Sequence, residues 1–165
     1  GTIHSGDKPQ GGGAEQFYRF LTEELRPEVE KRVLGGSSNI LVGHSYAGLF
    51  TLEMLLRHPG SFDTFMAIKL QNGTNTVTVS YIPNGFITVS GKDFSGKQLY
   101  VAFATQRRPG VKLNQFSLAD SLKIKIVPDM ENRHLRVVYK KFPEEMHGTV
   151  ALPGIFDGLK SLFRH

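Results

Sequence analysis

The sequence of 165 residues contains no cysteine and no tryptophan. Without cysteine there is no disulfide framework, no thiolate zinc site and no cysteine nucleophile. No stretch approaches the roughly 18 consecutive apolar residues that a membrane-spanning helix needs. Metal-protease spacing of the H-E-x-x-H type and the glycine-lysine phosphate loop are also missing. We therefore expect no metal and no cofactor.

The composition is that of an ordinary globular protein, with 39% hydrophobic and 21% charged residues. The length predicts a single domain over residues 1–165 with its own buried core. The net charge is +5, but the basic residues are scattered and form no long run. We interpret this charge as solvated surface and expect no nucleic-acid partner. The chain begins with Gly1 and not with methionine, so we expect a processed or trimmed end, and the cellular compartment stays open.

The first half of the chain alternates between helical and extended patterns. Four-residue spacing of apolar side chains predicts a helix from Phe17 to Val29, which Pro27 should kink or divide. Residues 39–43 are typical of a buried strand, residues 46–57 of a helix and residues 62–68 of a second strand. This order predicts an α/β fold with a parallel sheet covered by helices.

The second half adds two strands and a terminal helix. Residues 72–90 alternate strictly around an Asn-Gly turn, which predicts an inserted β-hairpin. Strands are expected at 98–104 and 135–142, and a helix is expected at 116–127. The chain ends in an apolar helical pattern around Ile155 and Leu159. A loop joins this helix to the strand before it.

The segment Gly43-His44-Ser45-Tyr46-Ala47-Gly48 lies between a predicted strand and a predicted helix. That is the setting of a nucleophile elbow, a sharp turn that exposes a serine hydroxyl above a sheet. The crowded turn needs small residues two before and two after the serine, and Gly43 and Ala47 supply them. The first helical amide, the N–H of Tyr46, is then a candidate oxyanion donor. In the alternative interpretation this is only a tight connection, with Ser45 near the helix N-cap.

A serine nucleophile needs a base, and His147 is the candidate. It lies five residues beyond the strand predicted at 135–142, in a loop before the last helix. This is the chain order of α/β hydrolases, in which the histidine follows the serine. His44 is next to the serine, but we expect its side chain to point away, since neighbouring side chains in an extended segment alternate.

The third member of a triad, the acid that orients the imidazole, is less clearly marked. No carboxylate follows the strand at 98–104 directly. Glu145, two residues before His147, is the candidate acid, and Glu144 and Asp120 are further alternatives. A Ser–His dyad oriented by a backbone carbonyl is equally compatible with the sequence.

Four stretches together resemble the putative esterase (esterase D-like) branch of the α/β hydrolases. They are SGDKPQGGGAEQFYRFLTEELRPEVEKR, NILVGHSYAGLFTLEMLLRHPGSFDTFMAI, SGKQLYVAFA and YKKFPEEMHGTVALPGIFDGLKSLF, in family order. The resemblance implies a three-layer fold and a serine ester hydrolase with Ser45 as nucleophile and His147 as base. The branch includes siderophore, feruloyl and acetyl-xylan esterases, and some of its siderophore esterases are thought to use a Ser–His dyad.

The chain departs from this family in two places. Family members have several strands before the position of Gly1, including the loop that donates the second oxyanion N–H, so we expect a shortened sheet. A Ser/Pro- and Trp-containing segment that lines the family's pocket is replaced here by the hairpin segment that begins at Lys69. An exposed sheet edge favours association, so we expect a homo-oligomer.

Two functions follow from these observations. The first is a serine carboxylesterase that hydrolyses short-acyl or small-alcohol esters, with a small-molecule ester as its partner. The second is a non-catalytic binding or assembly module derived from a truncated hydrolase. Ester turnover that depends on Ser45 distinguishes them.

Overall fold

The computed structural model describes residues 13–33, 38–70, 92–104 and 131–163. The chain forms two compact units, residues 1–37 and residues 38–165, and each is described here by itself. The predicted hairpin at 72–90 and the predicted helix at 116–127 lie outside the described residues.

The first unit contains one helical stretch in three parts, as the apolar spacing predicts. These are α1 (Ala14–Arg19), the π-helical η1 (Phe20–Leu25) and α2 (Arg26–Glu30). Pro27 lies in the first turn of α2, where its missing N–H costs little. The wide turns of η1 immediately precede this proline, and such local changes of helical pitch accompany kinks. A new α-helical segment therefore begins at Arg26, one residue before Pro27, and the backbone keeps helical angles across this junction.

The second unit is built on a parallel sheet. Its elements are β1 (Ile40–Ser45), α3 (Tyr46–Arg57), the short 3-10 turn η2 (Pro59–Ser61), β2 (Thr64–Leu70), β3 (Gln98–Ala104), β4 (Arg136–Phe142) and α7 (Ala151–Phe163). Within the described residues the strands lie in the order β1-β2-β3-β4, and every neighbouring pair is parallel. All four carboxyl ends therefore lie at one edge of the sheet, which is where ligands and catalytic groups gather in open α/β sheets.

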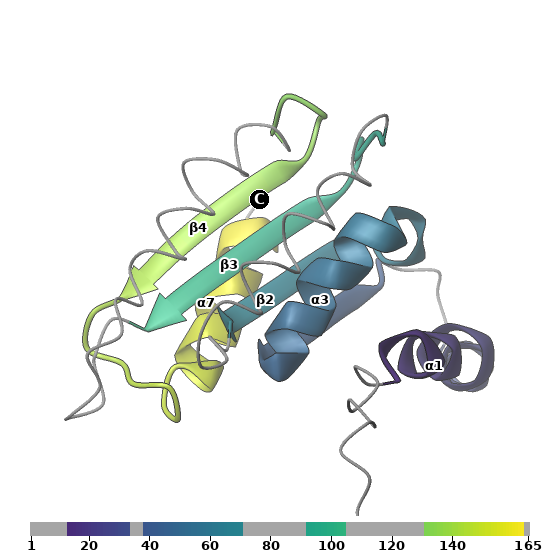
Figure 1. The fold of residues 1–165 in the computed structure, drawn as a ribbon, viewed down its shortest axis with the longest axis horizontal. Coiled ribbons are helices and arrows are strands. Elements are labelled where there is room, and N and C mark those ends of the chain that lie inside the picture. Colours follow the sequence, from purple (N-terminus) through teal and green to yellow (C-terminus); the bar gives the residue numbers. More distant parts are fainter. Residues whose placement is uncertain (1–12, 34–37, 71–91, 105–130, 164–165) are drawn as a thin grey trace, which may run out of the picture. The chain divides into compact units, whose positions relative to one another are not determined.

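The helices α3 and α7 cover opposite faces of this sheet (Figure 1). Met66, Ile68 and Tyr100 are fully buried on the face that α7 covers, together with Val150 and Leu162. The middle strand β3 is buried from Leu99 to Ala104, as a strand covered on both faces must be. The expected three-layer α/β-hydrolase-like arrangement is confirmed.

One part of the expectation was wrong. The strand at 39–43 was predicted to be buried, but in β1 only Gly43 is buried, and the side chain of Val42 is 40% exposed. The physical reason is the position of β1, which is an edge of the sheet in the part of the chain that the structure describes. Its apolar residues therefore meet a neighbouring strand on one side only.

Close packing and one polar bond hold α7 against the sheet. A Cβ atom on Gly158 would overlap the Met66 methyl group and lie 3.0 Å from the Tyr100 ring, so glycine lets the helix approach the strands. The Tyr100 hydroxyl, fully buried, donates a hydrogen bond of 2.8 Å to the Asp157 carboxylate on α7. Burial, together with this hydrogen bond to the anionic Asp157, raises the pKa of Tyr100 well above its usual range.

Removing the Tyr100 hydroxyl should destabilise the fold and change its alkaline limit. We expect Tyr100→Phe to lower the free energy of unfolding by about 1.5 kcal/mol at pH 7, the low end for a hydrogen bond to a charged group. Because the folded pKa lies above the unfolded value near 10, the wild type keeps this contribution below pH 10 and loses it as the pH rises further. Urea unfolding from pH 7 to 11 measures both effects. The exposed Tyr46 provides the control Tyr46→Phe, and an unchanged alkaline decline in Tyr100→Phe would contradict the assignment.

Candidate active site

The turn from β1 into α3 has a strained backbone at Ser45. Its φ of 64° and ψ of −119° lie in a region that residues with a Cβ rarely adopt. Ser45 occupies the N-cap position of α3, yet its side chain makes no capping hydrogen bond to that helix. A capping interaction therefore does not account for the strain. A strained serine between a strand and a helix is the geometry of a nucleophile elbow.

Gly43 makes this turn possible because the helix passes directly over it. A Cβ atom at position 43 would overlap the carbonyl group of Ala47 and the hydroxyl of Thr51, both on α3. The Thr51 hydroxyl itself donates to the Ala47 carbonyl at 2.8 Å, so the obstacle is fixed in place. The sequence predicts a small residue at this position, and the crowding explains why. The Ala47 side chain is exposed, so the crowding concerns position 43 and not position 47.

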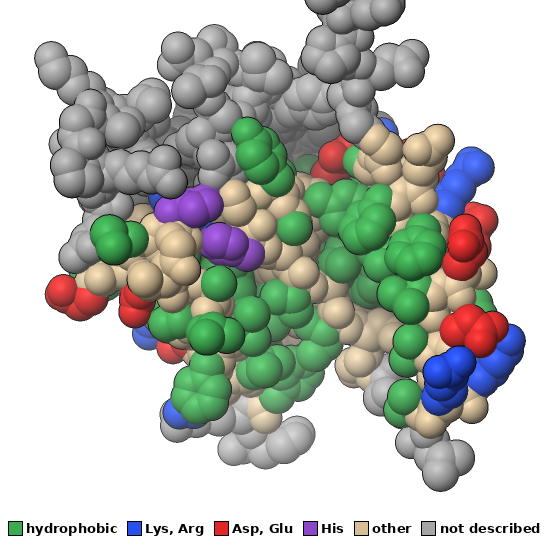
Figure 2. All heavy atoms as spheres, turned by 90° about the horizontal axis from the view of Figure 1, so that it is seen from below, with side chains coloured by type: hydrophobic (Ala, Val, Ile, Leu, Met, Phe, Trp, Pro, Cys, Tyr) green, Lys and Arg blue, Asp and Glu red, His purple; other side chains and the backbone are tan. Residues whose placement is uncertain are grey.

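The loop after β4 lies against the end of β1. His147 is in this loop, half-buried, in a series of turns between β4 and α7. The Nε2 atom of His44 is 2.9 Å from the backbone oxygen of His147, and the centres of the two imidazole rings are 4.9 Å apart. Figure 2 shows two histidine side chains side by side at the surface. The structure therefore brings the loop of the candidate base to the residue next to the candidate nucleophile.

The other predicted site residues have less defined surroundings. Tyr46 is the first residue of α3, where backbone amides have no carbonyl partner within the helix. The backbone N–H of Glu145 donates to the Phe142 carbonyl at 3.3 Å. Among the described residues, the Glu145 carboxylate makes no hydrogen bond to His147, and Glu145 stays a prediction for the acid. Glu144 is exposed, and Asp120 lies outside the described residues.

A charged residue that the sequence does not single out for the site lies beside this turn. His44 pairs with Ile68 and Ser45 with Leu70, so Lys69 is an extra residue in β2, opposite the step into Ser45. Its φ is 43°, its exposure is only 5%, and burial lowers the pKa of its ammonium group. The available signal was a lone lysine directly after an apolar strand.

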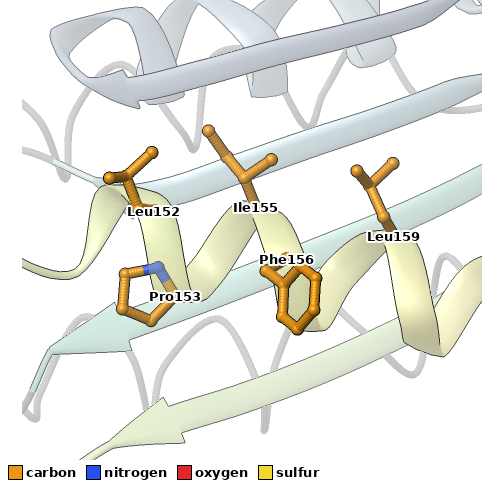
Figure 3. Close-up of a pocket in the computed structure, with 5 residues that line it drawn as sticks. All are labelled: Leu152, Pro153, Ile155, Phe156 and Leu159. Atoms are coloured by element: carbon orange, nitrogen blue, oxygen red, sulfur yellow. The ribbon is translucent and has the colours of Figure 1, made fainter.

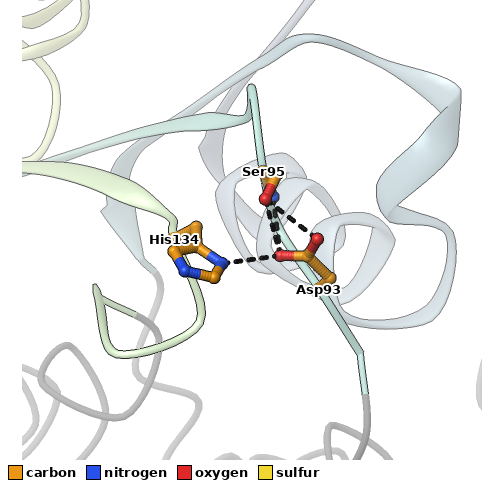
Figure 4. Close-up of polar contacts among 3 residues, drawn as sticks. All are labelled: Asp93, Ser95 and His134. Atoms are coloured by element: carbon orange, nitrogen blue, oxygen red, sulfur yellow. Dashed lines mark hydrogen bonds and ion pairs between the residues drawn. The ribbon is translucent and has the colours of Figure 1, made fainter.

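A second group of serine, histidine and aspartate lies at the amino ends of the strands. Asp93 and Ser95 precede β3, and His134 precedes β4 (Figure 4). Both the Ser95 hydroxyl, at 2.8 Å, and His134 Nδ1, at 3.1 Å, bond to the carboxylate oxygen Oδ1 of Asp93, and the hydrogen bonds from His134 and then Ser95 lower the pKa of Asp93. In a catalytic triad the serine is hydrogen-bonded to the histidine, and the histidine is hydrogen-bonded to the acid. Here the acid is in the middle, so we interpret the group as a turn-stabilising contact.

The outer face of α7 carries an apolar groove. It is lined by Leu152, Pro153, Ile155, Phe156 and Leu159, and the side chains shown in Figure 3 come from this one helix. A hydrocarbon lining offers no group that could activate or orient an ester. In the ranges that the structure describes, no three metal-ligating side chains come together. No helix among the same residues is both long enough and apolar enough to cross a bilayer.

Comparison with known proteins agrees with this geometry. Residues 3–70, which include the complete turn at Ser45, match the family described as "Putative esterase". The siderophore enterobactin esterase of Emericella nidulans is 45% identical over 178 aligned positions, which cover 94% of this chain and 58% of that protein. Over these regions the chain is similar to members of the putative esterase family. The ferri-bacillibactin esterase BesA of Bacillus subtilis is 43% identical over 60 residues, 36% of this chain and 21% of that enzyme.

Solved structures of two hydrolases have the same fold. An IroE-like serine hydrolase from Shewanella oneidensis superposes with a TM-score of 0.73 and 28% identity, over 98% of this chain and 53% of that chain. The siderophore hydrolase EstB from Aspergillus nidulans gives 0.68 at 24% identity, over 97% of this chain and 61% of that one, which supports the fold. Three of these relatives align along nearly the whole of this chain. The chain spans between a half and two thirds of the length of each of them.

Proposed function

We propose that the protein is a serine carboxylesterase that acts through an acyl-enzyme on Ser45. The observation that carries the proposal is the strained backbone of Ser45 between β1 and α3. In this turn, position 43 has room only for glycine. The match of this segment to an esterase family supports it independently.

In the proposed reaction, the Ser45 hydroxyl attacks the ester carbonyl while His147 accepts the hydroxyl proton. The tetrahedral intermediate places negative charge on the former carbonyl oxygen, and the Tyr46 N–H at the start of α3 stabilises it. The C–O bond to the alcohol then breaks, and His147 donates its proton to the leaving oxygen. Water, deprotonated by the same imidazole, releases the acid and restores Ser45.

The substrate class comes from the relatives. The fungal relative that aligns along nearly the whole chain is named a siderophore enterobactin esterase, and BesA is named a ferri-bacillibactin esterase. We therefore propose that the natural substrate is an ester of the siderophore type. Short p-nitrophenyl esters, which have a good leaving group, serve as a general probe of the same nucleophile.

Replacing His147 tests its proposed role as the general base. We expect a fluorophosphonate probe to label the wild type on Ser45, as identified by peptide mass spectrometry. We expect His147→Ala to lower the labelling rate and the turnover of p-nitrophenyl butyrate and enterobactin by about 10²–10⁴-fold, the usual contribution of a general base.

His134→Ala is the matched control, because His134 lies at the amino ends of the strands and bonds to Asp93. The control should keep wild-type rates. Labelling on another serine, or equal rates in the two histidine variants, would refute the proposal. If the protein hydrolyses the p-nitrophenyl ester but not enterobactin, the proposed esterase activity stands and the proposed siderophore substrate is refuted.

A further inference from the structure

His44 precedes the candidate nucleophile, and its side chain belongs to the opposite face of the sheet from Gly43. Position 43 faces α3, since a Cβ there would overlap Ala47 and Thr51. Side chains alternate along a strand, so Ile40, Val42 and His44 share the other face. Ile40 does pack against the core cluster that α7 covers. His44 is thus directed to the side from which the chain enters α7, where the His147 loop lies.

The hydrogen bond between His44 and this loop has a defined direction. A backbone carbonyl oxygen accepts only, so the Nε2 atom of His44 carries the proton and donates it to the His147 oxygen at 2.9 Å. This fixes the tautomer of a neutral His44. The two rings also contact each other, with centres 4.9 Å apart and planes inclined by 46°.

Several other backbone hydrogen bonds of the loop are local. Met146 N bonds to the Thr149 hydroxyl at 3.0 Å, and Thr149 N and Val150 N bond to the Met146 carbonyl at 3.2 and 3.1 Å. These bonds shape the turn but do not place it on the sheet. The His44 bond joins residues 103 positions apart and attaches the backbone of His147 to β1.

We propose that His44 is a positioning residue that holds His147 in place for Ser45. His44 is covalently linked to Ser45 and hydrogen-bonded to the backbone of His147, so it fixes the distance between nucleophile and base through two short connections. A displacement of about 1 Å in such a pair can cost on the order of 10²-fold in rate. The inference rests on the proposed function, and it assigns to His44 a role that its predicted direction away from Ser45 does not suggest.

Two substitutions separate the hydrogen bond from the ring contact. Phenylalanine keeps a ring against His147 but has no donor, whereas glutamine places an amide N–H near the position of Nε2. We expect His44→Phe to lower kcat for p-nitrophenyl butyrate by about 10–100-fold with little change in KM. We expect His44→Gln to recover most of this loss. Hydrogen exchange at the amides of residues 146–150 should be faster in His44→Phe and close to wild type in His44→Gln.

His58→Phe, at the end of α3, is the control for a histidine-to-phenylalanine change elsewhere in the same unit. If kcat and exchange in His44→Phe match this control, the positioning role is wrong. An equal loss in His44→Phe and His44→Gln, with unchanged exchange, would also overturn it. Ser45→Ala distinguishes the two proposals: if its turnover equals wild type, the esterase assignment fails, while the exchange measurement still tests the link between His44 and the loop.

Discussion

Ser45→Ala should lower the rate of ester hydrolysis by on the order of 10³-fold or more, leaving only the residual catalysis that substrate binding and the oxyanion donor supply. Alanine removes the oxygen that forms the acyl bond in the proposed reaction. The substitution removes no helix cap, because the Ser45 side chain makes no capping bond to α3. Turnover of p-nitrophenyl butyrate and fluorophosphonate labelling measure the loss, and circular dichroism verifies the fold.

The matched control is Ser61→Ala, since Ser61 ends the short η2 turn after α3 and lies outside the elbow. This variant should be labelled and should turn over substrate like the wild type. A wild type that is neither labelled nor active would favour the alternative of a non-catalytic module derived from a hydrolase. Equal activity in Ser45→Ala and wild type would place the reaction at another residue.

Gly43→Ala should disrupt both the elbow and the stability of the unit. A methyl group at position 43 would overlap the Ala47 carbonyl, which is helix backbone and cannot rotate away. We expect the free energy of unfolding to fall by about 3 kcal/mol, the upper part of the range for an overpacked site. For a chain of this size that lowers Tm by roughly 6–12 °C. Ester turnover should be lost with it, because α3 can move only by changing the backbone of Ser45.

Gly60→Ala is the appropriate control, since a Cβ at position 60 would meet no atom within 4 Å. Differential scanning calorimetry of the two variants compares the same chemical change in crowded and open surroundings. A Gly43→Ala variant with the Tm and activity of Gly60→Ala would show that α3 does not pass closely over β1, and the elbow geometry would be refuted.

Most secondary structure of the described residues follows from local pattern. The strand predicted at 98–104 has the bounds of β3, and the helix predicted at 46–57 has those of α3. These segments are strongly periodic or continuously apolar, so local composition and burial favour the same conformation. The apolar run before Lys69 also predicts a strand, but β2 continues through Lys69 to Leu70 by means of a bulge that no local signal indicates.

The candidate site was predictable in part for a similar reason. The elbow is a local feature, because Gly43, Ser45 and the helix that follows lie within a few residues of one another. His147 could be selected only by chain order. The placement of His44 against the His147 loop could not be predicted, because it depends on which strand lies beside which and on the lengths of the turns after β4.

The sequence by itself determined the order of helices and strands, the strained turn at Ser45 and the glycine that permits it. Each depends on residues close together in the chain, where steric limits and side-chain periodicity act directly. The tertiary structure alone decided that β1 lies at an edge of the sheet formed by the described residues, that Lys69 is buried beside the elbow and that His44 bonds to the backbone of His147. These contacts join distant segments, and their geometry is set by strand order and register, which no short stretch of sequence specifies.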